Sequence, residues 1–156
     1  MSRKNISRKR LPMKDSQYQS YLISLFVARL LKKGKKRLAQ KIVKGIFDII
    51  EKKTSRRSFS IFEKAVKKVS PKVEVKAYRV GGSTYQVPNQ VGQFRAVDLA
   101  LKWIIKGSER RSGKYLVIRI ADEIIDASRS TGNAIRKRDE THRMAKSNRT
   151  AAHLKY

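Results

Sequence analysis

Apolar residues recur along most of the chain at the spacing of an amphipathic α-helix. Positions three and four apart lie on one face of a helix, so each such stripe predicts a helix with one buried side. Pro71 and Gly113 fall between stripes, where helices commonly end or restart. The spacing predicts six helices, with apolar positions within residues 16–31, 38–50, 59–69, 97–105, 117–125 and 135–145.

Residues 72–88 follow a different period. Val73, Val75 and Ala77 alternate with polar neighbours, and the pair Gly81-Gly82 supplies a tight turn before a second alternating run. This pattern predicts a β-hairpin whose exposed side carries Lys76 and Arg79, suited to reaching phosphates from a narrow finger. An ordinary hairpin that only faces solvent is equally compatible. The predicted tip consists of Gly81, Gly82, Ser83, Thr84 and Tyr85.

These elements predict a mainly α fold, a single domain of about six helices with a β-hairpin. No internal repeat and no Pro-rich linker interrupts the sequence. We expect a basic N-terminal arm over residues 1–15, a helical domain over 16–147 and a basic tail over 148–156.

The net charge is more informative about function than any short motif. The chain carries 39 Lys and Arg against 12 Asp and Glu, a formal net charge of +27. Such a charge repels itself in the folded state unless a polyanion neutralises it, which favours a nucleic-acid partner. A membrane surface is the rival polyanion, but the most apolar stretch, residues 21–31, is too short to span a bilayer.

No constellation of reactive side chains points to catalysis, so we expect no enzymatic activity and no cofactor. The sequence has no cysteine, and its two histidines, His142 and His153, lack the spacing of a metal site. We expect His142 to bond within the last helix or to pack at its edge. The glycines at 81–82 lack the spacing of a nucleotide-binding loop. The one acidic cluster, within residues 122–126, is interpreted as solvated, with pairing to the chain's own cations or to a basic neighbour as alternatives.

The cations are spread over both ends, the hairpin and several turns. A DNA- or RNA-binding regulator with one recognition helix would concentrate them on one surface. Contacts from many directions suit a protein embedded in folded RNA, so we favour a scaffold, with the regulator and a membrane-surface protein as alternatives.

Long stretches of the chain resemble the family of small-subunit ribosomal protein seven. The strongest is VEVKAYRVGGSTYQVP at Val73 to Pro88, with GKK at Gly34 to Lys36, ALKWI at Ala100 to Ile104 and RKRDETHRMAKSNR from Arg136 in the same order. Tyr78 departs from the pattern, because the family commonly has a basic or small residue there.

The resemblance implies a primary rRNA-binding protein that binds the 3′ major domain of small-subunit rRNA and nucleates assembly of the subunit head. It also implies a hairpin tip near the exit-site tRNA and the mRNA path, with other proteins of the head and platform as neighbours. The contacts that carry over by position are Arg3, Lys4, Arg8, Lys9, Arg10, Lys35, Lys36, Arg37, Lys76 and Arg79. Further candidates from basic regions are Arg95, Arg110, Arg111, Lys114, Arg143 and Arg149.

Usage rich in Lys and Ile, with no transit peptide, resembles versions encoded in plastid genomes. We therefore expect a ribosome of the plastid stroma, with the bacterial cytoplasm as the alternative and no membrane partner.

Overall fold

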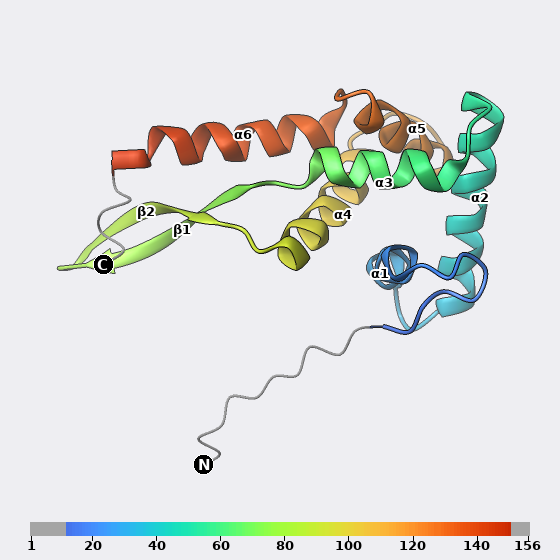
Figure 1. Cartoon of the computed structure of the whole chain (residues 1–156), viewed down its shortest axis with the longest axis horizontal. Coiled ribbons are helices and arrows are strands. Elements are labelled where there is room, and N and C mark those ends of the chain that lie inside the picture. The colour runs from blue at the N-terminus through green and yellow to red at the C-terminus, as the bar shows by residue number, and fades with distance from the viewer. Residues whose placement is uncertain (1–11, 151–156) are drawn as a thin grey trace, which may run out of the picture. The chain divides into compact units, whose positions relative to one another are not determined.

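A computed structural model describes residues 12–150 of the chain. The contacts divide it into two compact units, one up to Gln40 and one from Lys41 onward. The arm residues Arg3 to Arg10 and His153 lie outside the described residues. Over residues 12–150 the secondary structure is six helices and one two-stranded hairpin, which confirms the mainly α fold with a β-hairpin (Figure 1).

In the first unit, helix α1 (Tyr21–Leu30) begins later than the predicted residue 16. The Asp15 carboxylate accepts hydrogen bonds from the backbone N–H groups of Gln17 and Tyr18, which makes a turn instead of a helical start. Ser20 then caps α1 by accepting from the Leu22 N–H at 3.2 Å. The turn at Asp15 and the cap at Ser20 therefore set the beginning of the helix.

Helix α2 (Lys36–Thr54) starts in the first unit and runs mainly through the second, where α3 (Ser58–Val69) follows after a short turn. Phe47 and Phe62, one from each helix, are buried with ring centroids 5.6 Å apart. The α3 helix ends at Val69, directly before the Ser70-Pro71 pair, as the sequence predicts.

The hairpin consists of β1 (Val73–Val80) and β2 (Ser83–Gln90), paired antiparallel one residue to one residue. Gly81 and Gly82 have φ angles of 55° and 85°, which suit the two central residues of a tight hairpin turn. Helix α6 (Asn133–Ser147) packs along both strands of the hairpin, and Figure 1 shows the two elements running side by side. The hairpin is thus supported along its length by a helix.

Helices α4 (Gln93–Glu109) and α5 (Leu116–Ser128) complete the second unit, and α5 packs against both α3 and α4. Helix α4 ends at Glu109, two residues after Gly107. Gly107 marks a close approach: a Cβ there would lie 3.0 Å from Oε1 of Glu123 and 3.2 Å from the Ala134 nitrogen. The glycine therefore brings α4 close to α5 and α6.

Candidate nucleic-acid interface

The turn before α2 in the first unit is exposed and wholly cationic. Lys33 and Gly34 have positive φ angles of 52° and 72°, which turn the chain tightly ahead of the helix. Lys36 and Arg37 then occupy the first turn of α2, where the positive end of the helix dipole disfavours cations. A bound anion would relieve this repulsion, so the predicted contacts Lys35, Lys36 and Arg37 lie in a place suited to phosphate.

The hairpin presents its two predicted cations differently from what we expected. In the observed register Arg79 pairs with Thr84 and Lys76 pairs with Val87. Residues an odd number apart point to opposite faces of a strand, so the prediction of one exposed side that carries both is wrong. Both side chains are exposed, and Val87, on the same face as Lys76, is fully buried. The two cations therefore lie on opposite faces of the hairpin.

The tip of the hairpin is exposed from Gly81 to Tyr85. Tyr78 pairs with Tyr85 across the strands, and its hydroxyl accepts a hydrogen bond from Nδ2 of Asn89 at 3.3 Å. Tyr85 leaves much of its ring accessible, which suits stacking on an unpaired base.

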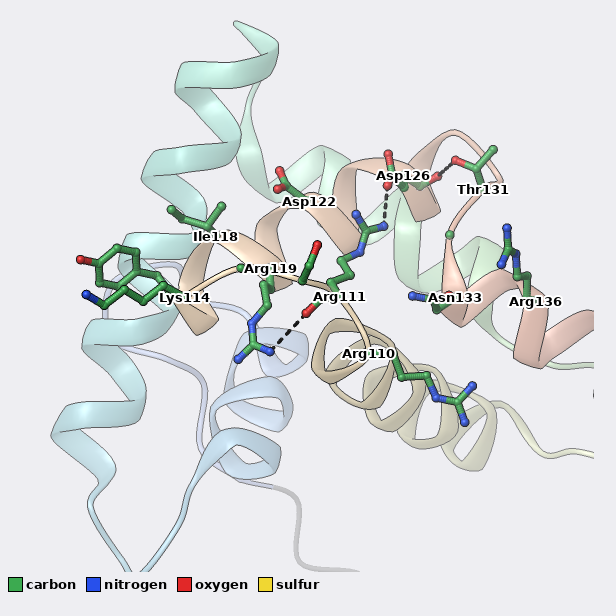
Figure 2. Close-up of a pocket in the computed structure, with 14 residues that line it drawn as sticks. Arg110, Arg111, Lys114, Ile118, Arg119, Asp122, Asp126, Thr131, Asn133 and Arg136 are labelled. Atoms are coloured by element: carbon green, nitrogen blue, oxygen red, sulfur yellow. Dashed lines mark hydrogen bonds and ion pairs between the residues drawn. The ribbon is translucent and has the colours of Figure 1, made fainter.

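The connector between α4 and α5 forms one wall of a cleft of about 720 Å³, and the start of α6 forms another. Figure 2 shows Arg110 and Arg136 on one side of this cleft and Lys114 on the other. Among residues 12–150 these three side chains form no ion pair. Arg110 and Lys114 were predicted contacts, and the structure brings them into one cleft with Arg136, which the site prediction omitted.

Two other arginines in the cleft have internal partners. Arg119 donates to the carbonyl oxygens of Glu109 at 3.5 Å and Arg111 at 3.4 Å, and its Nε is buried without a partner in the described part of the chain. Arg111 donates through Nε to Oε2 of Glu123 and through Nη2 to Oδ2 of Asp126, each at 2.5 Å. Burial lowers the pKa of Arg111, but the hydrogen bonds to Asp126 and Glu123 outweigh it and hold the pKa above its usual value. Arg111 therefore remains charged and is committed to holding the connector.

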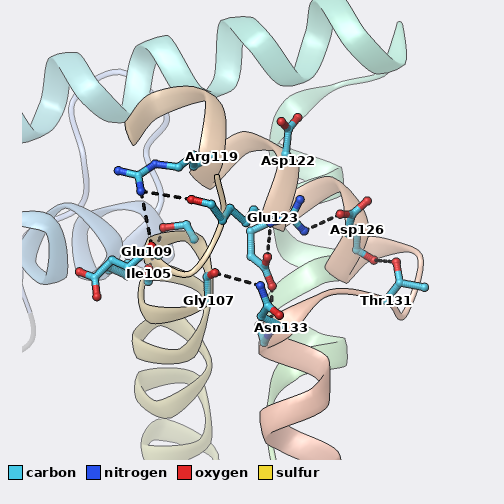
Figure 3. A network of polar contacts seen from close by, with 12 residues as sticks. Ile105, Gly107, Glu109, Arg119, Asp122, Glu123, Asp126, Thr131 and Asn133 are labelled. Atoms are coloured by element: carbon cyan, nitrogen blue, oxygen red, sulfur yellow. Dashed lines mark hydrogen bonds and ion pairs between the residues drawn. The ribbon is translucent and has the colours of Figure 1, made fainter. Parts of the chain in front are cut away.

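Glu123 organises the wall behind this cleft. Its side chain is 0% exposed, and Oε1 accepts the Ala134 N–H of the first turn of α6 at 2.7 Å. Figure 3 shows this carboxylate between α5 and α6, beside Asn133, whose Nδ2 donates to the Gly107 carbonyl at 3.2 Å. A buried anion at a helix N-terminus is favourable, so Glu123 joins α6 to the connector.

The interpretation of the acidic cluster as solvated is wrong for the described structure. Glu123 is buried, and all three carboxylates pair with the chain's own cations, since Asp122 contacts Nζ of Lys53 at 2.5 Å. Desolvation explains the pairing of Glu123, because a buried carboxylate is stable only with a cation or several hydrogen bonds beside it.

His142 also has a partner other than the expected one. Its Nε2 accepts the backbone N–H of Lys72, just before β1, at 3.1 Å. Burial, followed by the charge of Arg138, lowers the pKa of His142, so the neutral ring needed for this hydrogen bond is favoured. The histidine thus connects α6 to the base of the hairpin.

The remaining predicted cations have mixed surroundings. Arg95 donates through Nε to both oxygens of Glu74 at 2.9 Å, and Lys76 lies 3.8 Å from the same carboxylate. Arg143 and Arg149 are exposed on and after α6.

The described structure offers no support for other classes of site. Within residues 12–150 no group of three or more His, Asp or Glu could hold a metal ion. The same residues include no helix that is both long enough and apolar enough to cross a membrane.

Comparison with known proteins identifies the family. Residues 2–149 match the family model described as ribosomal protein S7p/S5e. The chain is 54% identical to small ribosomal subunit protein uS7c of Trieres chinensis over 92% of this chain and 91% of that protein. It is 46% identical to uS7 of Prochlorococcus marinus strain NATL1A and 49% identical to uS7 of Acaryochloris marina, each over 100% of both chains. This chain therefore belongs to the ribosomal protein S7p/S5e family, whose members are structural components of the ribosome and not enzymes.

Proposed function

We propose that the protein is a structural constituent of the small ribosomal subunit that binds the 3′ major domain of its rRNA and nucleates assembly of the subunit head. Membership of a ribosomal protein family and full-length similarity to relatives named small ribosomal subunit proteins support the subunit. The RNA domain and the assembly step rest on the family resemblance of the hairpin and of the basic turn before α2.

The observation that carries RNA binding is a surplus of cations that form no ion pair among residues 12–150, presented by several separate elements. Lys35 to Arg37 precede and open α2, Arg79 lies near the hairpin tip, and Arg110 with Lys114 lines the cleft at the α4–α5 connector. Phosphate contacts from many directions are typical of a protein held within folded RNA.

The proposed organisation keeps a basic arm over residues 1–15, an rRNA-binding domain over 16–147 and a basic tail over 148–156. Arg111 is assigned to internal support because its Nε and Nη2 donate to the carboxylates of Glu123 and Asp126. The other predicted cations are proposed as contacts to rRNA, with Arg136 added from the cleft.

The hairpin tip, residues 81–85, is proposed to lie near the exit-site tRNA and the mRNA path. Its exposed glycines allow close approach of a backbone, and the exposed ring of Tyr85 offers a stacking surface. The proposed location is a plastid ribosome, with a bacterial ribosome as the alternative, and the proposed neighbours are other proteins of the head and platform.

The test is binding of the purified protein to the 3′ domain of small-subunit rRNA and to an unrelated RNA of equal length, across a salt series. The proposal predicts a preference for the 3′ domain that persists as salt rises. Equal loss of both RNAs would contradict it, because a nonspecific polycation behaves in that way.

Variants locate the contact. Changing Lys35, Lys36 and Arg37 together to Ala removes three charges from the turn and is expected to weaken binding by at least about tenfold at moderate salt. The matched control changes Lys41, Lys44 and Lys102 to Ala, three exposed cations outside the proposed interface. Equal affinity of the two triple variants would exclude the turn from the site.

A further inference from the structure

A second basic groove lies where the end of α2, helix α3 and the end of α5 meet. Its volume is about 440 Å³, and five cations line it: Lys53, Arg56, Lys64, Lys68 and Arg129. No Asp or Glu is among the residues that line it. The resemblance and the predicted contacts include none of these five residues, which come from three separate segments of the chain.

Two of the five cations have structural partners and fix the walls of the groove. Lys68 donates through Nζ to the Ser128 carbonyl at the end of α5 at 2.8 Å, which binds α3 to α5. Lys53 pairs with Asp122 at 2.5 Å. Figure 1 shows α3 and α5 side by side, as their contacts require.

The other three cations, Arg56, Lys64 and Arg129, are exposed and form no ion pair or side-chain hydrogen bond within residues 12–150. Three unpaired positive charges around one hollow repel one another in the free protein. Such an arrangement is stabilised by an anion that spans them, and guanidinium groups add two-pronged recognition of phosphate oxygens.

The floor of the groove argues against a protein partner. Ile61 and Ile125 are each only 8% exposed, so an incoming chain would find little apolar surface. Protein interfaces usually depend on apolar anchors at their centre. A phosphodiester backbone needs no such anchor, because it is bound through charge and through hydrogen bonds to its phosphate oxygens.

We propose that this groove, built by Arg56, Lys64 and Arg129 on walls fixed by Lys53 and Lys68, binds a segment of RNA backbone at a surface separate from the predicted contacts. The inference rests on the proposed function, since it assigns a further contact surface to the same rRNA. The connector cleft and this groove have different lining residues, so RNA that occupies both is held at two places on one unit.

The test compares two triple variants of the full chain in the same salt series with the 3′ domain. The first carries Arg56→Gln, Lys64→Gln and Arg129→Gln, and the control carries Lys41→Gln, Lys44→Gln and Lys102→Gln, which is an equal loss of charge. If three phosphates are contacted, the slope of log affinity against log salt falls in magnitude by about 2–3 in the first variant and stays near the wild-type value in the control. Thermal unfolding of each variant checks that the fold is intact, which is expected because the exchanged side chains are exposed.

A second readout needs no variant. Acetylation of Lys64, followed by mass spectrometry, is expected to slow several-fold when the rRNA is bound, whereas acetylation of Lys102 is not. Equal slopes for the two variants together with an unprotected Lys64 would overturn the groove proposal, even where the wild-type protein prefers the 3′ domain. If the wild-type protein shows no preference for the 3′ domain, the proposed function is overturned. A difference in salt slope between the groove variant and the control variant on any RNA would still support the groove. Poly-glutamate serves as a competitor of acidic-protein chemistry. If it changes the acetylation rate of Lys64 while the slope of log RNA affinity against log salt stays the same, the groove binds an acidic protein and the inference is overturned.

Discussion

Replacing Arg111 by Met should destabilise the protein strongly, because it leaves the buried Glu123 carboxylate without its cation. Glu123 is 0% exposed, so water has no access to replace the lost guanidinium, and only the Ala134 N–H remains to bind the charge. Breaking a buried ion pair from one side costs about 3–5 kcal/mol.

The second contact of Arg111 contributes little to this cost. The Asp126 side chain is 36% exposed and gains water when the guanidinium is removed. An ion pair of that kind is worth about 1 kcal/mol or less. For a chain of this size, a loss of about 4 kcal/mol lowers Tm by about 8–16 °C.

The assay is urea denaturation followed by circular dichroism, which yields the free energy of unfolding in water. The matched control is Lys137→Met, which breaks the exposed pair with Glu140, whose side chains are 44% and 46% exposed. The control should change the free energy of unfolding little, because solvent screens an exposed pair. The double variant Arg111→Met, Glu123→Met should lose less than Arg111→Met alone, because only the Ala134 N–H is then left unpaired.

A loss below about 1 kcal/mol for Arg111→Met, equal to that of the control, would refute the assignment of Arg111 as the cation that compensates Glu123. A double variant whose loss of stability equals the sum of the two single losses would refute it as well, since no coupling would then join the two side chains.

Three further perturbations test other parts of the fold. Gly132→Ala should destabilise by more than about 1 kcal/mol in urea titrations, because its φ is 96° and the new Cβ would lie 2.9 Å from Oε1 of Glu123, and an unchanged midpoint would contradict that packing. Lowering the pH should destabilise the protein through His142, whose folded pKa lies below the ordinary 6.5. The stability that the neutral ring contributes is present above pH 6.5 and is lost as the pH falls through the folded pKa. This pH dependence should be absent from the pH profile of Tm in His142→Leu. Phe62→Ala should cost about 3–5 kcal/mol because the ring is fully buried against Phe47, and a loss below 1 kcal/mol would place that ring outside the core.

The helical spacing of apolar residues was sufficient to predict the helices whose packing follows the apolar stripe. In α3 the predicted core positions Phe62, Val66 and Val69 are all buried. The hairpin was equally predictable, since the alternation of apolar and polar residues and the glycine pair both indicate it. The mainly α fold with one hairpin was therefore predictable from local patterns.

Local patterns failed where a tertiary contact decides. Gly107, in the last turn of α4, is the point where Glu123 approaches, and the spacing of apolar residues did not indicate this contact. Burial of Glu123 had a signal in the sequence, because it lies three residues after Ile120 and four before Ala127, on the same helical face. Its charge led to the opposite interpretation.

The candidate interface was predicted in its segments but not in its geometry. Turns and the hairpin were identifiable from runs of Lys and Arg, whereas the partner of Arg111 depends on how α4 meets α5. The groove around Lys64 was not predictable, because its cations are separated by up to 76 residues and only the packing of three helices brings them together.

The proposed function places this protein on small-subunit rRNA within the ribosome. The most direct measurement expresses the full chain with an affinity tag in a plastid or bacterial host, sediments the ribosomal subunits through a high-salt gradient and maps RNA crosslinked to the protein. The protein is expected to remain with the small subunit, and the crosslinks are expected to fall in the 3′ major domain. Release from the subunit at high salt, with crosslinks spread over unrelated RNAs, would contradict it.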